Sequence, residues 1–170
     1  FTNMYDCDTS AVTDMSYMFY GCYTLTTPNL AWIDLSSCKK IDWMFAYSIL
    51  GTLDLHFFDT SHVKSANYAF YYCKATELNI KEWDLSGIEG GMTDFCSHMP
   101  NCTTINMEDF FMPTFTELGN VFYQDTALQT VVGPIHGESI QRVRDVFNSC
   151  GVTTFNDSLF DFPNLKHIYY

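Results

Sequence analysis

Positive charge is scarce in this sequence, which has 8 Lys and Arg residues against 20 Asp and Glu residues and a net charge of −12. Such a surface repels phosphate backbones and anionic lipid headgroups, which disfavours nucleic acid and membrane-surface partners. No run of about 18 consecutive apolar residues occurs, so the sequence contains no candidate transmembrane helix. The acidity is typical of a domain that stays soluble despite an aromatic content of 17%.

Catalytic and metal-binding signatures are missing as well. The sequence has no Gly-x-Ser-x-Gly element, no phosphate-binding loop and no His-Glu-x-x-His pair, so it indicates neither an enzyme nor a cofactor. The five histidines follow no metal-ligand spacing and no Cys-x-x-Cys pair is present, which argues against a zinc site. The seven cysteines are an odd number and mostly recur at apolar positions of a repeat, so we expect reduced, buried thiols. A disulfide between Cys73 and Cys102 stays open as the alternative.

The sequence does contain an internal repeat. Residues 12–22 read VTDMSYMFYGC, and residues 63–73 read VKSANYAFYYC, 51 positions later. Apolar or small residues recur seven, four and one positions before nearly every one of six anchors, which are Phe19, Phe45, Phe70, Met99, Phe122 and Phe147. The anchors are 26, 25, 29, 23 and 25 residues apart, which requires a four-residue insertion at residues 88–92 and a two-residue deletion after Met99. Columns that stay in phase over such distances predict a solenoid.

Local chemistry predicts the structure of one unit. The apolar spacing of three before each anchor predicts a short helical segment, partly 3₁₀-like. Asp-x-Ser triplets precede this segment and can cap its free N–H groups; they begin at Asp8, Asp34, Asp59 and Asp84. After the anchor, apolar residues alternate as in a short strand over residues 52–55, 77–80 and 104–107.

These features together predict the architecture of the whole chain. We predict an α/β solenoid spanning residues 1–170, with six to seven units of about 25 residues. Each unit contributes one short parallel strand and one short helical segment, because a single unit cannot bury its own apolar face. The chain opens inside a unit and shows no polar cap, so we expect it to be a piece of a longer protein.

The repeat resembles a known family. Residues 15–25 read MSYMFYGC-x-x-L, and residues 59–70 read D-T-S-x-V-x-x-A-x-x-A-F, a combination similar to the BspA-like leucine-rich-repeat surface proteins of bacteria. The likeness extends over essentially the whole chain, although the Asp-x-Ser triplet is absent from the units containing residues 111–113 and 136–138. The resemblance implies a right-handed, leucine-rich-repeat-like coil. It also implies a non-catalytic binding module at the cell surface or in a secreted protein.

The strand face is the first candidate binding surface. Side chains between the apolar strand positions point away from the core. They form the column Asn29, Asp54, Asn79, Asn106, Val131 and Asn156, flanked by His56, Glu77, Lys81 and Glu108. Such donors and acceptors along a concave face could bind a ligand. A ladder of mutual hydrogen bonds between repeats is an equally supported interpretation.

Two other groups of side chains have alternative interpretations. Tyrosines gather around the anchors, where they could stack on sugar rings or contact a protein, or simply cover the edges of a thin core; they are Tyr17, Tyr20, Tyr23, Tyr68, Tyr71, Tyr72 and Tyr123. The aspartates that begin the triplets, Asp8, Asp34, Asp59 and Asp84, form an acidic column together with Asp161. This column could hold calcium, although capping and turn formation is the favoured role.

The leading functional hypothesis is an adhesin-like module that binds a protein or glycan ligand, for example an extracellular host component, over its strand face. The alternative is a structural spacer or assembly element of a larger surface structure or phage virion. Neither hypothesis involves catalysis, a metal or a cofactor.

Overall fold

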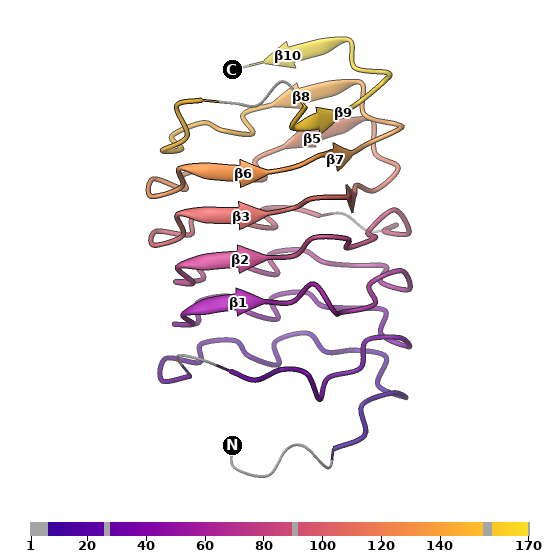
Figure 1. Ribbon diagram of the computed structural model, residues 1–170. Coiled ribbons are helices and arrows are strands. Elements are labelled where there is room, and N and C mark those ends of the chain that lie inside the picture. The colour runs from indigo at the N-terminus through magenta and orange to yellow at the C-terminus, as the bar shows by residue number, and fades with distance from the viewer. Residues whose placement is uncertain (1–6, 26–27, 90–91, 155–157, 170) are drawn as a thin grey trace.

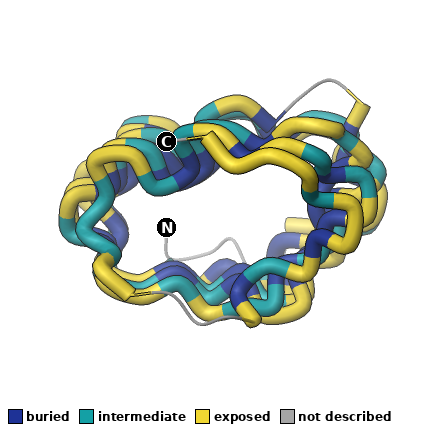
Figure 2. Tube along the Cα trace, turned by 90° about the horizontal axis from the view of Figure 1, so that it is seen from above, coloured by how far each residue is buried: buried dark blue, intermediate teal, exposed yellow. Residues whose placement is uncertain are grey.

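The chain winds into a parallel β-solenoid. The computed structural model describes residues 7–25, 28–89, 92–154 and 158–169. About five turns, each about 25 residues long, stack on one another from the N-terminal to the C-terminal end (Figure 1). Viewed along the stacking axis, the trace is an oblong ring with its buried positions on the inner side (Figure 2). The predicted solenoid and its period are confirmed.

The first sheet contains the strands that the alternating segments predict. Its four parallel strands follow the order β1–β2–β3–β6 and are β1 (Thr52–Asp54), β2 (Glu77–Asn79), β3 (Thr104–Asn106) and β6 (Thr130–Val132). Leu53, Leu78 and Ile105 pair in register and are fully buried. The apolar side of each strand therefore faces the core, as the alternation requires.

Two further sheets cover the other faces of the coil. One contains β4 (Phe110–Phe111), β7 (Ile135–His136) and β9 (Phe160–Asp161) in the order β4–β7–β9. The other contains β5 (Glu117–Gly119), β8 (Arg142–Arg144) and β10 (His167–Tyr169) in the order β10–β8–β5. In the first turns this last face has only isolated parallel bridges, which join Asp14, Lys40 and Ser65. The later turns thus contribute more than the single strand that was predicted per unit.

The predicted helical segment is wrong, because the described residues contain no helix. In residues 15–22, alternate N–H groups bond three residues back, as in successive tight turns. The intervening N–H groups bond carbonyls of the next turn of the solenoid, as Phe19 does to Met44 at 2.8 Å. Tyr17 and Gly21 have φ values of 63° and 64°. These left-handed residues reverse the local coiling, so the segment runs along the face instead of winding into a helix.

The same pair of left-handed positions recurs in every later turn, two residues before and two residues after the anchor. The residues are Trp43, Tyr47, Tyr68, Tyr72, Asp94, His98, Asn120, Gln124, Asp145 and Ser149. The spacing of three that suggested a helix therefore comes from tight turns, which share the three-residue hydrogen-bonding distance of a 3₁₀ helix.

The register of the inter-turn hydrogen bonds corrects one predicted anchor. In the first turns the N–H of an anchor donates to the carbonyl just before the next anchor. Phe70 donates to Phe95 at 2.9 Å, so the fourth anchor is Cys96 and not Met99. The anchors at 19, 45, 70, 96, 122 and 147 are then 26, 25, 26, 26 and 25 residues apart. The four-residue insertion and two-residue deletion are therefore not needed.

The anchor rings form a ladder inside the coil. Phe45 stacks on Phe19 and on Phe70, with centroids 5.3 Å apart in both pairs. At the fourth turn Phe95, one position before the anchor, packs edge-to-face on Phe70 at 5.4 Å. At this turn the small Cys96 occupies the anchor position, and the bulky ring stands one residue before it. This exchange explains why the anchor was predicted three residues too late, at Met99.

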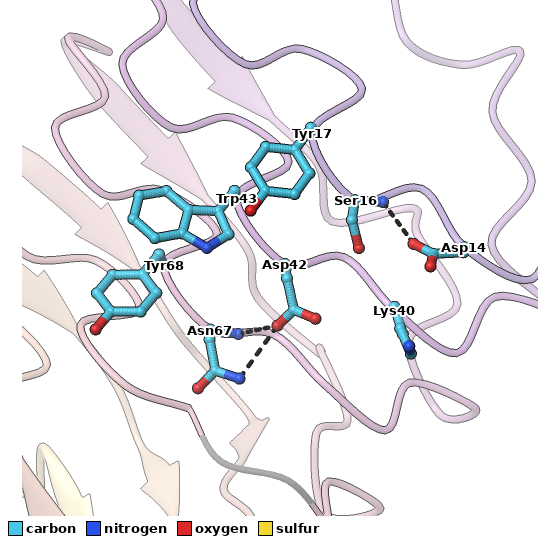
Figure 3. Close-up of a pocket in the computed structure, with 8 residues that line it drawn as sticks. All are labelled: Asp14, Ser16, Tyr17, Lys40, Asp42, Trp43, Asn67 and Tyr68. Carbon is cyan, nitrogen blue, oxygen red and sulfur yellow. Dashed lines mark hydrogen bonds between the residues drawn. The ribbon is translucent and has the colours of Figure 1, made fainter.

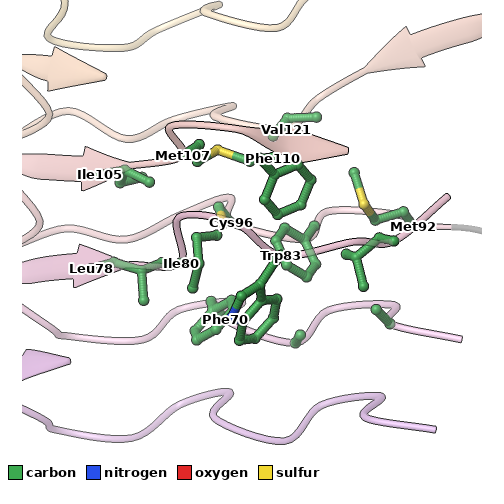
Figure 4. Packing of buried hydrophobic residues seen from close by; sticks show 14 of the residues in the cluster. Phe70, Leu78, Ile80, Trp83, Met92, Cys96, Ile105, Met107, Phe110 and Val121 are labelled. Atoms are coloured by element: carbon green, nitrogen blue, oxygen red, sulfur yellow. The ribbon is translucent and has the colours of Figure 1, made fainter. Parts of the chain in front are cut away.

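Trp83 lies at the centre of the continuous core. It is fully buried and packs against Phe70 (Figure 4). It also packs against Phe95 and donates its Nε1–H to the Leu55 carbonyl at 2.9 Å. The indole therefore buries a large apolar area while its one polar group is satisfied by the preceding turn. Full burial of each large apolar side chain in such a core contributes about 1.5–3 kcal/mol.

The Asp-x-Ser triplets form corners and do not cap helices. Each aspartate accepts the backbone N–H of the serine two residues later, at 2.8–3.1 Å. The central residue alternates between Thr and Leu, and all four side chains point inward; they are Thr9, Leu35, Thr60 and Leu85. The Thr60 hydroxyl accepts the Asp84 N–H at 2.9 Å and donates to the Asp84 carbonyl at 3.2 Å. Thr9 and Thr60 are 51 positions apart, which is the same two-turn spacing that separates residues 12–22 from residues 63–73.

All seven cysteines lie in the described ranges and are free thiols. Cys73 and Cys102 are both fully buried, and no disulfide joins them. Desolvation raises the pKa of the Cys102 thiol to about 12, so this cysteine stays neutral at physiological pH.

Candidate functional site

Aromatic side chains cover one face of the first turns and form what we call the aromatic surface. Its members are Tyr17, Tyr20, Trp43, Tyr47, Tyr68, Tyr71 and Tyr72, continued by His98 and Tyr123. Tyr17 is 56% exposed and Tyr20 is 45% exposed, while Trp43 and Tyr68 are half-buried. Monomeric proteins rarely expose a contiguous patch of this kind without a binding role.

The rings of the aromatic surface lie in rows along the stacking axis. Trp43 is parallel to Tyr17, with centroids 6.2 Å apart, and stacks on Tyr68 at 4.3 Å. A second row runs from Tyr47 to Tyr72 at 5.3 Å and on to His98 at 4.9 Å. Tyr20 and Tyr71 join the rows, because each makes edge-to-face contacts with Trp43 of the first row and Tyr47 of the second. Each such pair contributes about 0.5–1.5 kcal/mol beyond its burial.

Packing of the phenols changes their acidity. Desolvation raises the pKa of Tyr47, and the nearby tyrosines at positions 20 and 72 raise it further. Desolvation also raises the pKa of Tyr71, with contributions from Tyr47 and Tyr72. Tyr47 and Tyr71 therefore present neutral hydroxyl groups at physiological pH.

Three residues of the aromatic surface occupy a strained backbone position that other residue types fill in the later turns. Tyr17, Trp43 and Tyr68 occupy a left-handed position that costs a side chain about 1–2 kcal/mol. In the later turns the equivalent position holds Asp94, Asn120 and Asp145, residue types that tolerate this conformation best. The backbone therefore does not require aromatic residues there, which points to a role for the exposed rings.

A groove of about 640 Å³ borders the aromatic surface. Its lining comes from three successive turns and comprises Asp14, Ser16, Tyr17, Lys40, Asp42, Trp43, Asn67 and Tyr68. The three rings lie on one side, and Asp14, Lys40 and Asp42 lie on the other (Figure 3).

Hydrogen bonds fix the polar side of the groove. Asp42 Oδ1 accepts the Asn67 N–H and the Ser65 hydroxyl, both at 2.7 Å. Asp14 Oδ1 accepts the Ser16 N–H at 3.0 Å. Hydrogen bonding by Ser16, helped by nearby Lys40, lowers the pKa of Asp14, which is therefore ionised at physiological pH. The groove thus offers two oriented acid groups beside a row of rings.

The predicted strand-face residues mostly support corners of the coil. Each asparagine oxygen accepts the N–H two residues later: Asn29 from Ala31 at 3.1 Å, Asn79 from Lys81 at 3.4 Å and Asn106 from Glu108 at 3.0 Å. Asp54 accepts from the Asn79 amide at 2.8 Å and lies 2.6 Å from His56 Nδ1. Part of the column is thus the ladder of mutual hydrogen bonds that was one of the two interpretations.

The remaining strand-face residues are separate from the aromatic surface. Glu77 and Glu108 are exposed, and Lys81 pairs with Glu82 at 3.2 Å. Asn106 pairs with Val132 and not with Val131, whose side chain packs on the core. Asn156 lies outside the described residues. Ligand binding by the strand face stays a prediction.

Two titratable sites escaped the sequence reasoning. Asp125 is fully buried three positions after its anchor. Cys22, Ser48 and Cys73 occupy the same position in other turns, and their small side chains could have indicated that this position faces inward. His136 bridges two carboxylates of neighbouring turns, Asp161 at 3.0 Å and Asp109 at 3.2 Å. Across the described ranges, no group of three or more His, Cys, Asp or Glu residues is arranged to hold a metal ion.

None of the described segments is a helix with the length and apolar character needed to span a bilayer.

Comparisons with known proteins give a match to a protein family. No curated protein and no solved structure matches the chain. Residues 2–102, more than half of the chain and including most of the aromatic surface, match the family described as "Mycoplasma protein of unknown function, DUF285". The chain therefore belongs to this family.

Proposed function

We propose that this chain is a non-catalytic binding module of a cell-surface or secreted protein, and that its aromatic surface contacts a protein or glycan ligand. One observation carries the proposal: Tyr17, Trp43 and Tyr68 are displayed from strained left-handed positions where later turns use Asp or Asn. Tyr and Trp give large contact area at low entropic cost and dominate binding hot spots.

The resemblance to BspA-like leucine-rich-repeat surface proteins supports the location and the adhesin-like role. The residues that carry it, 15–25 and 59–70, include three members of the aromatic surface, Tyr17, Tyr20 and Tyr68. Membership of the matched family is compatible with this role, and the matched range of residues 2–102 contains the whole groove.

The aromatic surface is a better candidate than the strand face. On the strand face, the oxygens of Asn29, Asn79 and Asn106 already accept backbone N–H groups. A ligand would have to compete with these intramolecular bonds, which limits the net gain from binding there. The rings of the aromatic surface, by contrast, remain partly exposed in the folded chain.

An array of extracellular-matrix proteins and glycans tests the proposal. The chain would be compared with Tyr47→Gly/Tyr72→Gln, since Gly21 and Gln124 occupy the same position in other turns. Glu77→Ala/Glu108→Ala is the matched strand-face variant. Loss of two ring contacts should weaken binding at least about tenfold, because a hot-spot residue contributes more than about 1 kcal/mol.

The strand-face variant should bind as the unaltered chain does, and circular dichroism should show both variants folded. Weaker binding by Glu77→Ala/Glu108→Ala with unchanged binding by the tyrosine variant would place the ligand on the strand face and contradict the proposal.

A further inference from the structure

We infer that the groove beside Trp43 binds a neutral saccharide, with a sugar ring against the row Tyr17–Trp43–Tyr68 and its hydroxyl groups directed at Asp42 and Asp14. This inference rests on the proposed function and specifies the ligand class of the same surface. It depends on three properties of the groove: its parallel rings, its oriented acceptors and its charge.

The aromatic side of the groove suits a flat, weakly polar face. Tyr17 and Trp43 differ by 4° in ring plane, and Trp43 and Tyr68 differ by 19°. The rings therefore form a row along the stacking axis, and an extended chain of sugars could follow that row over three turns (Figure 3). The parts of these rings that their stacked neighbours leave exposed are apolar, and the C–H face of a pyranose can pack on them. An ammonium ligand would instead require rings arranged around it as a cage.

The polar side supplies acceptors held in place before binding. Asn67 and Ser65 fix Asp42, and the Ser16 N–H fixes Asp14, in each case through Oδ1. The second oxygen of each carboxylate accepts none of these bonds and can receive a ligand hydroxyl, whereas a strand-face asparagine has only one side-chain oxygen. Sugar hydroxyls donate strong hydrogen bonds to carboxylates. Little entropy is lost on binding, because the carboxylates are already ordered. A few oriented polar groups beside an apolar wall are the usual composition of small-ligand sites.

Charge favours a neutral ligand over an anionic one. Two carboxylates, Asp14 and Asp42, face a single cation, Lys40, in the groove. The chain as a whole carries a net charge of −12. An acidic sugar would be repelled both at the groove and on approach.

Trp43 provides the signal for a direct test. Trp83 is fully buried, so a Trp32→Phe background leaves Trp43 as the accessible tryptophan. The full chain with this change would be titrated with cellohexaose, maltohexaose and chitohexaose, and separately with hexagalacturonate and tetramethylammonium. At least one neutral hexasaccharide should change the tryptophan fluorescence saturably, whereas hexagalacturonate and tetramethylammonium should not.

Two variants assign the signal to the groove, with calorimetry as the readout that needs no tryptophan. Trp43→Asn introduces the residue type of Asn120 and should weaken the binding of the responding hexasaccharide at least tenfold. Tyr17→Asn makes the same change at the exposed end of the row and should weaken binding at least threefold. Phe57→Ala removes an exposed ring that does not line the groove and should leave binding unchanged.

Several results would overturn the inference. These are no response to any neutral hexasaccharide, a stronger response to hexagalacturonate or tetramethylammonium, or a response that both groove variants retain while folded. If the array finds a ligand that depends on Tyr47 and Tyr72 but no neutral hexasaccharide binds, the saccharide inference fails and the proposed function stands.

Discussion

At the scale of single residues, Asp125 is the most unusual group in the core. It is fully buried, its Oδ1 accepts the Met99 N–H at 2.6 Å, and its Oδ2 has no hydrogen-bond partner among the described residues. Desolvation raises the pKa of Asp125 to about 8, and the hydrogen bond from Met99 only partly opposes this. The titratable groups around it are the thiols of Cys96, Cys102 and Cys150. The carboxyl is therefore protonated at neutral pH.

This burial predicts a pH-dependent stability. The unfolded chain releases the Asp125 proton above about pH 4, whereas the folded chain keeps it up to about pH 8. The free energy of unfolding should thus fall as pH rises between these values. The accumulated loss at pH 7, relative to a pH below 4, is about 4 kcal/mol. Asp125→Asn keeps the acceptor oxygen but cannot ionise. Urea denaturation should show the variant gaining stability relative to the unaltered chain as pH rises from 4 to 8.

The matched control is Glu77→Gln, which makes the corresponding acid-to-amide change at an exposed residue and should not reproduce this gain. A difference between Asp125→Asn and the unaltered chain that stays constant from pH 4 to 8 would show that Asp125 titrates normally.

His136 predicts a smaller effect of the same sign. Partial burial lowers its pKa, but hydrogen bonds to Asp161 and Asp109 outweigh burial and raise the pKa above 6.5. The protonated imidazole donates to both carboxylates and links three turns. This contribution is fully present below about pH 6.5 and is lost as pH rises through the folded pKa.

His136→Gln should therefore cost stability at pH 6 and cost less at pH 8.5, with a change under about 1 kcal/mol because both aspartates are more than half exposed. Chemical denaturation at the two pH values measures it. Equal costs at both pH values would show that the bridge makes no contribution through its charge.

At the scale of elements, the corner of the Asp-Thr-Ser triplet joins one turn to the next. Thr60 is 2% exposed, and its hydroxyl satisfies both the N–H and the carbonyl of Asp84. Thr60→Val keeps the shape but leaves the Asp84 N–H without its acceptor. Removing one partner of such a bond costs roughly 1–3 kcal/mol, and urea denaturation should show this loss.

Ser61→Ala is the control for this corner, since Ser61 is exposed and its hydroxyl bonds only to the neighbouring side chains of Asp59 and His62 and not to another turn. It should cost less than about 0.5 kcal/mol. Equal losses for the two variants would mean that the buried threonine does not hold the turns together.

The elements also show what the sequence could predict. The strands at residues 52–55, 77–80 and 104–107 were readable, because alternation of apolar residues has a period that only strands share. The helix was not excluded, because tight turns and a 3₁₀ helix share one hydrogen-bond spacing. A pattern of apolar residues does not reveal whether φ at Tyr17 or Trp43 is positive or negative, and that sign separates these tight turns from a helix. The fourth anchor was missed because large side chains defined the anchor column. At this turn the large residue, Phe95, stands one position before the anchor, Cys96.

At the scale of the whole molecule, the candidate site exists only because turns stack. The groove takes its lining from three turns, and the rows of rings extend over four. The sequence placed tyrosines near the anchors, but which rings meet depends on the register between turns. That register follows from inter-turn hydrogen bonds, which join residues about 25 positions apart. The groove was therefore beyond the reach of the sequence alone.

The central claim is that this stacked aromatic surface is where the ligand binds. Hydroxyl-radical footprinting of the chain, with and without the strongest ligand from the array, tests it residue by residue. We predict protection of Trp43, Tyr47 and Tyr72, and unchanged labelling of the exposed rings Phe57 and Phe111. Protection of Phe57 or of strand-face residues, with Trp43, Tyr47 and Tyr72 labelled as in the free chain, would contradict the account.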